Sequence, residues 1–256
     1  MRHCRFELQG RARYGVVESV DGVDKITQLL RNDFSTEKIE PIVMSKAVLL
    51  APVEPSKIVC LGRNYRAHAA EMGNEVPVEP LIFFKPSSSI VAAGETIRRP
   101  KASALVHFEG ELGVVISRTC YKPPLDEDIR SYILGYTAIN DVTARDLQKK
   151  DGQWTRAKGF DTFCPVGPVV TNEIDPWKGV KVETRVNGKV HQSGTTLDLV
   201  FPVDAIIRYI SGIMTLFPGD LIATGTPEGV GPLAAGDVVE VSVEGVGTLR
   251  NPVADE

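Results

Sequence analysis

Hydrophobic residues along most of the chain recur with the alternation of β-strands, and glycine and proline separate the runs. The clearest strand-like runs are residues 57–61, 81–84, 111–117, 132–140, 164–171 and 238–243. Asn187–Gly188 separates two further alternating segments, and this dipeptide is typical of a two-residue hairpin turn. The pattern therefore predicts a chain that is mostly β.

Helical periodicity is confined to short segments, of which the clearest are residues 64–72, 142–150 and 202–213. Asn64 is a candidate N-cap of the first helix, which we expect to stop at Gly73. Pro202 suits the first turn of the last helix, where apolar residues recur three and four positions apart. Together with the strands, these segments predict an α+β fold, mostly β, with a few short helices.

The start of the chain differs from the rest. Residues 3–8 and 13–20 predict two short strands. The segment 51–55 then contains two prolines, which neither a helix interior nor a central strand would accept. We therefore expect a small N-terminal β subdomain at residues 1–50 and a larger domain at residues 51–256.

Composition and charge exclude several classes of partner. The chain has 256 residues, with 29 Lys and Arg against 33 Asp and Glu, so its formal net charge is −4. Neither nucleic-acid binding through a basic arm nor membrane binding through a polybasic patch is expected. No apolar run approaches the roughly 18 residues of a membrane span, and the charged start argues against a signal peptide, so we expect a cytoplasmic protein. The four cysteines lack a C-x-x-C motif, which argues against a zinc knuckle or a disulfide framework.

Three carboxylates are candidate metal ligands. Glu109 and Glu111 alternate along a predicted strand, so they project from one face, and two like charges this close need a cation between them. Asp141 lies at the junction of a predicted strand and a predicted helix. If the three meet, their oxygens suit a hard divalent ion such as Mg²⁺ or Mn²⁺. A solvated strand edge for the glutamates and a helix cap for Asp141 remain the alternatives.

His68 and Glu71 are candidates for acid–base chemistry. Three positions apart on the first predicted helix, they share a face, where the carboxylate could orient the imidazole as a general base. A solvated surface pair is the alternative. Lys85 and Lys158 lie among apolar or turn residues, where each could stabilise a developing enolate beside a metal, or simply face solvent. The glycine-rich segment 224–231 lacks the nucleotide-binding patterns, so it is either a tight turn or a source of N–H groups for an anionic substrate.

Seven segments between about residues 57 and 231 together resemble the fumarylacetoacetate hydrolase family, in its acylpyruvase-like branch. Among them are HFEGELGVVI, GYTAINDVTARDLQ, WTRAKGFDTFCPVGP and PGDLIATGTPEGVG. The resemblance implies a β-roll with a few short helices and a small N-terminal β appendage, in which residues 51–256 form the catalytic domain. It also implies a homodimer and one divalent metal per subunit, Mg²⁺ or Mn²⁺, which Ca²⁺ could replace in a crystal.

The same resemblance implies roles for individual residues. The implied metal ligands are Glu109, Glu111 and Asp141. The implied catalytic residues are His68 and Glu71, on a mobile lid helix, and Lys158 beside the metal. The implied substrate-binding residues are Arg63, Lys85, Gln148 and Thr226. A small anionic 2-oxo acid is therefore the expected partner.

The implied chemistry acts on a 2-oxo or 1,3-dicarbonyl acid through a metal-stabilised enolate. Hydrolytic carbon–carbon cleavage of an acylpyruvate-type substrate, with water activated by His68, is the leading prediction. Decarboxylation of an oxaloacetate-like acid and isomerisation of a 2-hydroxydienedioate in aromatic catabolism use the same enolate and remain alternatives. This chain has no room for the large N-terminal domain of fumarylacetoacetate hydrolases proper, which argues against fumarylacetoacetate as the substrate. A non-catalytic β module that binds a metal or a ligand is the alternative of another class.

Overall fold

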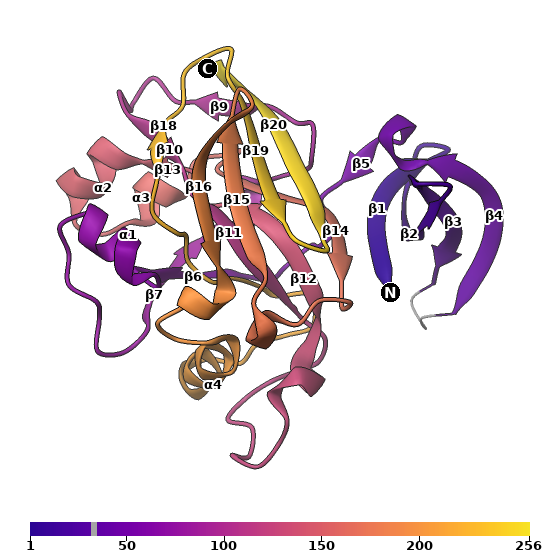
Figure 1. The fold of residues 1–256 in the computed structure, drawn as a ribbon, viewed down its shortest axis with the longest axis horizontal. Helices are drawn as coiled ribbons and strands as arrows, with labels where there is room; N and C mark the ends of the chain where they lie inside the picture. The colour runs from indigo at the N-terminus through magenta and orange to yellow at the C-terminus, as the bar shows by residue number, and fades with distance from the viewer. Residues whose placement is uncertain (32–34) are drawn as a thin grey trace.

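The computed structural model describes residues 1–31 and 35–256, and it shows a β-rich body with a separate group of strands at the N-terminus (Figure 1). The largest sheet runs through both parts. Its strands lie in the order β4 (Thr36–Val43), β3 (Val23–Leu30), β2 (Arg11–Val20), β1 (Arg2–Leu8), β14 (Cys164–Thr171), β12 (Ile133–Asn140), β11 (Gly110–Ile116), β17 (Leu221–Ala223), β6 (Ile58–Gly62) and β7 (Leu81–Lys85). Two short strands join this sheet, β5 (Leu49–Leu50) beside β1 and β8 (Ile90–Val91) beside β14.

Two smaller sheets and a few helices complete the fold. The second sheet has the order β16 (Lys189–Thr195), β15 (Lys181–Val186), β19 (Val238–Val243), β20 (Gly247–Asp255) and β9 (Ile97–Arg99). The third has the order β13 (Thr143–Ala144), β10 (Val106–Phe108) and β18 (Gly231–Pro232). The α-helices are α1 (Arg66–Glu71), α2 (Arg145–Asp151), α3 (Thr155–Lys158) and α4 (Val203–Ile213). Single 3₁₀ turns lie at η1 (Met44–Lys46), η2 (Ser87–Ser89), η3 (Ile129–Tyr132), η4 (Pro176–Lys178) and η5 (Thr196–Asp198). The expectation of a mostly β fold with a few short helices is confirmed.

The core lies where the second sheet covers β11 and β12 of the first (Figure 1). All seven residues of β11 are buried, and its Leu112 and Val114 belong to the same buried cluster as Val241 of β19. The two sheets lie in close contact at Gly110, where a Cβ atom would lie 2.0 Å from Oγ1 of Thr184 on β15. Glycine at the start of β11 therefore allows the second sheet to close over the strand.

The N-terminal strands form one end of the large sheet and lie to the right of the main body in Figure 1. β1 pairs with β2 along its whole length and with β14 only at its first residues. The sequence predicted strands at residues 3–8 and 13–20 but missed β3 and β4, which complete this group. A domain boundary near residue 50 stays a prediction; β5 and its pairing with β1 lie there.

The helices differ from the sequence expectation mainly at their first residues. α1 begins at Arg66 with Tyr65 as its N-cap, so the prediction that Asn64 caps this helix is wrong. α2 begins only at Arg145, because the two preceding residues pair with β10 as a strand. The predicted hairpin is present between β15 and β16, and both residues of its turn have positive φ, 51° at Asn187 and 79° at Gly188. Among the described residues, no helix combines the length and the apolar character that a membrane span would require.

Candidate active site

Strand pairing brings three acidic side chains together. Glu109 lies between β10 and β11, Glu111 is on β11, and Asp141 follows β12. Because Gly110 pairs with Asn140, the ends of β11 and β12 lie side by side, and the Asp141 N–H donates to the carbonyl of Glu109 at 2.8 Å. One carboxylate oxygen from each of the three acids lies within 4.8 Å of the others. The sequence alone left open whether these three residues would meet, and in the structure they do.

None of the three carboxylates faces open solvent. Glu109 is 5% exposed, and Glu111 and Asp141 are each 1% exposed. The alternative of a solvated strand edge is therefore wrong for the glutamates. The second sheet covers the opposite face of β11, at Gly110, Leu112 and Val114. The glutamate side chains are instead enclosed by Arg145, Lys158 and the backbone of Gly225. The alternative of a helix cap is wrong for Asp141, since the N-cap of α2 is Ala144.

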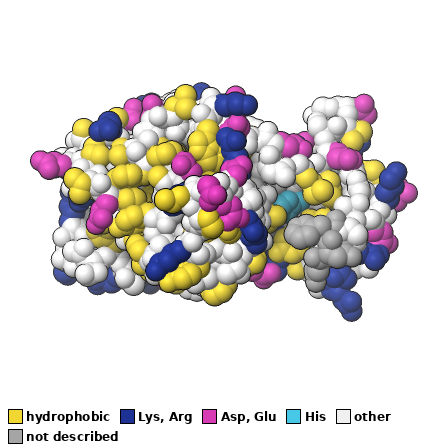
Figure 2. All heavy atoms as spheres, turned by 90° about the horizontal axis from the view of Figure 1, so that it is seen from below, with side chains coloured by type: hydrophobic (Ala, Val, Ile, Leu, Met, Phe, Trp, Pro, Cys, Tyr) yellow, Lys and Arg dark blue, Asp and Glu magenta, His cyan; other side chains and the backbone are white. Residues whose placement is uncertain are grey.

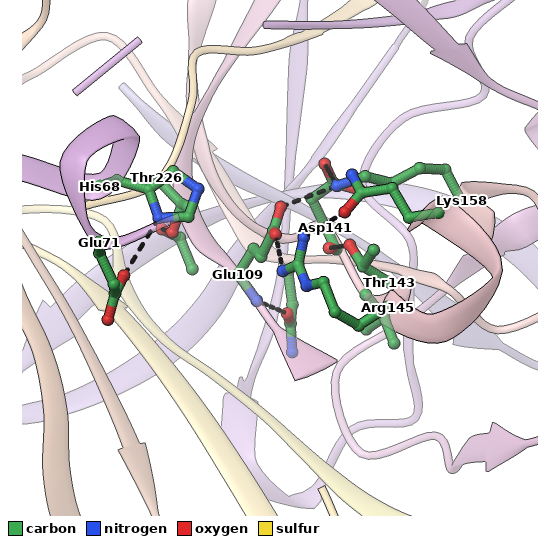
Figure 3. A network of polar contacts seen from close by, with 12 residues as sticks. His68, Glu71, Glu109, Asp141, Thr143, Arg145, Lys158 and Thr226 are labelled. Carbon is green, nitrogen blue, oxygen red and sulfur yellow. Dashed lines mark hydrogen bonds and ion pairs between the residues drawn. The ribbon is translucent and has the colours of Figure 1, made fainter. Parts of the chain in front are cut away.

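Buried cations neutralise two of the acids (Figure 3). Lys158, at the end of α3, donates from Nζ to Glu109 Oε2 at 2.7 Å and to Asp141 Oδ2 at 2.6 Å. Lys85, at the end of β7, donates to Asp141 Oδ1 at 2.7 Å and to the carbonyl of Val142 at 3.1 Å. Both lysines are almost completely buried, so the solvent-exposed alternative is wrong for each.

Arg145 is a further cation of the cluster that the sequence analysis did not single out. Its guanidinium donates from Nη2 to Glu109 Oε1 and from Nη1 to Gln148 Oε1, the latter at 2.6 Å. Figure 3 shows it beside Glu109, where it contacts one carboxylate oxygen while Lys158 contacts the other. The only sequence signal was its position four residues after Asp141, which is too common a spacing to be informative.

Glu111 differs from the other two acids because no lysine or arginine in the described part of the chain forms an ion pair with it. Among the described residues its Oε2 accepts one neutral hydrogen bond, from the N–H of Gly225 at 2.7 Å. Burial, reinforced by the charges of Asp141 and Glu109, raises the pKa of Glu111 well above its usual range. Burial would also raise the pKa of Glu109, but the charges of Lys158 and Arg145 outweigh it and hold that pKa below its usual range. A divalent cation would compensate the unpaired carboxylate, so the donor set fits a hard metal ion.

His68 and Glu71 lie on α1 with their side chains turned toward each other (Figure 3). Nδ1 of His68 is 3.3 Å from Oε2 of Glu71, and Oε1 of Glu71 accepts a hydrogen bond from the N–H of Gly229 at 3.0 Å. His68 is only 7% exposed. The alternative of a solvated pair is therefore wrong for His68, although Glu71 reaches the surface.

A cavity of about 240 Å³ connects the acidic cluster with α1. The sequence-predicted residues that line it are Arg63, His68, Glu109, Glu111, Gln148, Lys158 and Thr226. Lys85 does not line it, so its ammonium supports Asp141 rather than forming a wall of the cavity. Phe83 and Trp154, which the sequence analysis missed, form an apolar wall with ring centroids 5.1 Å apart. The cavity thus combines a carboxylate and cation cluster, an imidazole and an aromatic surface.

The chain is similar to known proteins over most of its length. The family model described as Fumarylacetoacetate (FAA) hydrolase C-terminal matches residues 57–254. Oxaloacetate tautomerase YisK of Bacillus subtilis is 41% identical over 224 aligned positions, which cover 82% of this chain and 74% of that protein. A 2,4-didehydro-3-deoxy-L-rhamnonate hydrolase of Sphingomonas is 37% identical and covers 100% of this chain and 96% of its own. The crystal structure of 5-carboxymethyl-2-hydroxymuconate delta-isomerase from Mycobacterium smegmatis has a TM-score of 0.90 and 41% identity, over 100% of both chains.

Proposed function

Because the chain belongs to the fumarylacetoacetate hydrolase family, a family of enzymes, we propose that it is a divalent-metal-dependent enzyme that acts on 2-oxo or 1,3-dicarbonyl acids through an enolate. The similar proteins named above are a tautomerase, a hydrolase and an isomerase. These reaction types can share one step, in which a proton or an acyl group leaves the carbon beside the 2-oxo group and negative charge moves to oxygen. The stabilisation of that charge is the function we assign to the cavity.

The balance of charges around the cavity supports this proposal. Lys85, Lys158 and Arg145 pair with Glu109 and Asp141, and with Glu111 counted as ionised their three positive charges equal the three negative charges of the acids, so the cluster is formally neutral before a metal binds. The residues that would hold a divalent cation are Glu109, Glu111 and Asp141. Such an ion would supply Lewis acidity toward a substrate carboxylate and its 2-oxo oxygen. It would also leave the cluster with an excess of positive charge that matches the two negative charges of a 2-oxo acid enolate.

His68 is the group that would move a proton. Its Nδ1 faces Glu71, which orients the ring, so Nε2 remains to accept a proton on the cavity side. In the leading proposal, Nε2 takes a proton from the water that attacks the distal carbonyl of an acylpyruvate. The bond between that carbonyl carbon and the pyruvate methylene then breaks, and the electron pair remains on the pyruvate enolate. Lys158 stabilises the enolate, and protonation of its carbon gives pyruvate beside a carboxylic acid.

Proton transfer on an oxaloacetate-like diacid is the second candidate. Two further cations line the cavity, Arg63 and Lys149, and within the described chain neither forms an ion pair. They would suit a second carboxylate at the far end of a short substrate. The relative from Bacillus subtilis that is named an oxaloacetate tautomerase also supports an oxaloacetate-like diacid as the substrate. In this reaction, and in decarboxylation of such a diacid, no water is needed as a nucleophile.

The decisive experiment is turnover of a substrate panel by metal-stripped protein, with and without Mg²⁺ or Mn²⁺. The panel contains acetylpyruvate, oxaloacetate, fumarylpyruvate and a hydroxydienedioate, and products are followed by NMR. We expect metal to restore turnover, and the product then identifies hydrolysis, decarboxylation or isomerisation. Absence of metal-dependent turnover of every compound would refute the proposal and favour a non-catalytic binding module.

A variant of Glu111 separates metal binding from folding in the same experiment. We expect Glu111→Gln to abolish the Mg²⁺-dependent rise in melting temperature, while raising the melting temperature of the metal-free protein because an unpaired buried carboxylate is removed. Glu183→Gln is the matched control, because Glu183 lies on β15 and pairs with Lys181 and Arg185 outside the cavity. An unchanged Mg²⁺ effect in Glu111→Gln would refute the assignment of Glu111 as a ligand.

The assembly and location expected from the sequence remain proposals. Hydrophobic side chains gather in several places on the main body in the view from below (Figure 2), which leaves apolar surface for a second copy of the chain. We propose a homodimer, which sedimentation equilibrium would test. A cytoplasmic location likewise awaits cell fractionation.

A further inference from the structure

Gln192 is a buried residue of β16 that the proposed chemistry does not use. Its side chain is fully buried and connects the second sheet to the acidic cluster. Oε1 accepts a hydrogen bond from the N–H of Gly110 at 2.9 Å, and Nε2 donates to Thr226 Oγ1 at 2.6 Å and to the carbonyl of Pro227 at 2.7 Å. Gly110 is the residue between the two glutamates, and Thr226 lines the cavity. One amide therefore connects the backbone of the ligand-bearing strand to a hydroxyl of the cavity wall.

The direction of each hydrogen bond in this network is determined by the backbone groups. The Gly110 N–H can only donate and the Pro227 carbonyl can only accept, so the orientation of the Gln192 amide is unambiguous. Both protons of Nε2 are then used, and Thr226 Oγ1 is an acceptor from Gln192. Thr226 Oγ1 also lies 2.8 Å from the carbonyl oxygen of Gly110. Because a carbonyl cannot donate, the hydroxyl proton of Thr226 lies between these two oxygens.

The hydroxyl of Thr226 is thus left with one lone pair and no proton for the cavity. We propose that Gln192 is a positioning residue that presents Thr226 Oγ1 to the cavity as a hydrogen-bond acceptor, so that the site prefers an acid with a hydroxyl donor at this position. The hydroxyl of an enol or of a 2-hydroxy acid meets this requirement, whereas a 2-oxo oxygen would face the lone pair of Thr226. This inference rests on the proposed function, because it assumes that the acid binds in this cavity.

Binding of a matched pair of acids tests whether Thr226 Oγ1 accepts a hydrogen bond from the ligand. The probes are lactate, which has a 2-hydroxyl, and pyruvate, which has a 2-oxo oxygen, and their dissociation constants are measured by calorimetry with saturating Mg²⁺. We expect Thr226→Val to weaken lactate binding by about 5- to 10-fold and to change pyruvate binding by less than about twofold. Thr226→Ser keeps the hydroxyl and should bind both acids as the wild-type protein does. An equal loss for both acids in Thr226→Val, or a larger loss for pyruvate, would overturn the inference.

A double-mutant cycle tests whether Gln192 acts through Thr226. Gln192→Met keeps the approximate length of the side chain and removes all three hydrogen bonds, and we expect it to reduce the preference for lactate by a similar factor. In the Thr226→Val background the same change should alter lactate binding by less than about twofold. A purely structural contribution would instead give the same loss in both backgrounds and would overturn the positioning role. If Gln192→Met does not fold, Gln192→Asn retains an amide that is too short to reach all three partners and takes its place in the cycle.

Thr184→Val is the matched control for the cycle. Thr184 lies opposite Gln192 across β15 and β16 and is fully buried, and its Oγ1 has no hydrogen-bond partner within residues 1–31 and 35–256. The isosteric change should leave both dissociation constants unchanged. Absence of turnover with the lactate preference intact would refute the proposed enzyme function and leave this inference standing. Absence of binding by either acid to the wild-type protein with Mg²⁺ would overturn this inference.

Discussion

Replacement of Lys158 by methionine removes the cation that connects two of the three carboxylates. Methionine has nearly the length of the lysine side chain, so Lys158→Met removes the charge without opening a large space. Nζ of Lys158 makes two short hydrogen bonds, to Glu109 at 2.7 Å and to Asp141 at 2.6 Å, and its side chain is 2% exposed. The variant therefore leaves two buried carboxylates without a shared counter-ion.

The size of the effect follows from the partners that remain. Removal of one partner of a buried ion pair costs about 3–5 kcal/mol in the free energy of unfolding. Arg145 still pairs with Glu109 and Lys85 still pairs with Asp141, so we expect the lower end of this range. For a chain of this size, about 3 kcal/mol corresponds to a decrease of about 6–12 °C in melting temperature.

Thermal and urea unfolding with and without Mg²⁺ test this reasoning. Because the vacated oxygens face the proposed metal site, Mg²⁺ should raise the melting temperature of Lys158→Met more than that of the wild-type protein. Lys57→Met is the control, since Lys57 pairs with buried Asp220 away from the cavity. Asp220 keeps hydrogen bonds from Ser56, so the control should lose less stability and gain nothing specific from Mg²⁺. An unchanged melting temperature in Lys158→Met, or an equal response of both variants to Mg²⁺, would show that the lysine does not counterbalance a metal-binding cluster.

Three further outcomes are expected. Burial alone would raise the pKa of Asp220, but hydrogen bonds, first among them that from Lys57, lower it below its usual value near 3.8. The ionised carboxylate therefore stabilises the fold above about pH 4, and this contribution is lost as pH falls below that value. The free energies of unfolding of the wild-type protein and Asp220→Asn, measured by urea titration, should therefore converge in acid. A difference that stays constant with pH would contradict the prediction. Gly110→Ala should destabilise the protein by about 1–3 kcal/mol because the new Cβ meets Thr184. Adding Thr184→Ala should restore part of that lost stability in urea titrations. If the destabilisations of the two single variants simply add in the double variant, the contact is ruled out. Arg63→Gln should raise the KM for oxaloacetate by about tenfold and leave that for acetylpyruvate nearly unchanged, and equal effects on both would exclude binding of a second carboxylate.

The local pattern of residues in the sequence was sufficient to predict much of the fold. The hairpin at Asn187–Gly188 was predictable because two residues with positive φ are a local requirement that this dipeptide meets. The buried strand β11 was predictable from its apolar run, although its burial on both faces was not. Alternation along one strand indicates which side chains share a face, but it does not indicate what covers each face. Here the second sheet covers the face of Leu112 and Val114, and buried cations meet the face of the glutamates.

The ends of the helices were less predictable because tertiary partners compete with local signals. Asn64 has a good capping side chain, but its amide donates to the carbonyls of Thr224 and Phe201, and its Oδ1 accepts from the N–H of Phe201. These partners are more than 130 positions away in the chain. A residue that connects three loops in this way cannot also cap the helix beside it.

The sequence by itself determined the family, the predominance of strands and the residues that are candidates for the site, because residue types and their order carry that information. Only the tertiary structure decided how those residues are paired. Glu111 forms no ion pair with a lysine or arginine of the described chain. Lys85 faces Asp141 across 56 positions of the chain, and Gln192 joins Gly110 to Thr226 from another sheet. Each of these contacts depends on which strands lie side by side and on which sheet covers them. Burial then gives each pairing a large effect on stability, because an unpaired charge or hydrogen-bonding group is costly away from water.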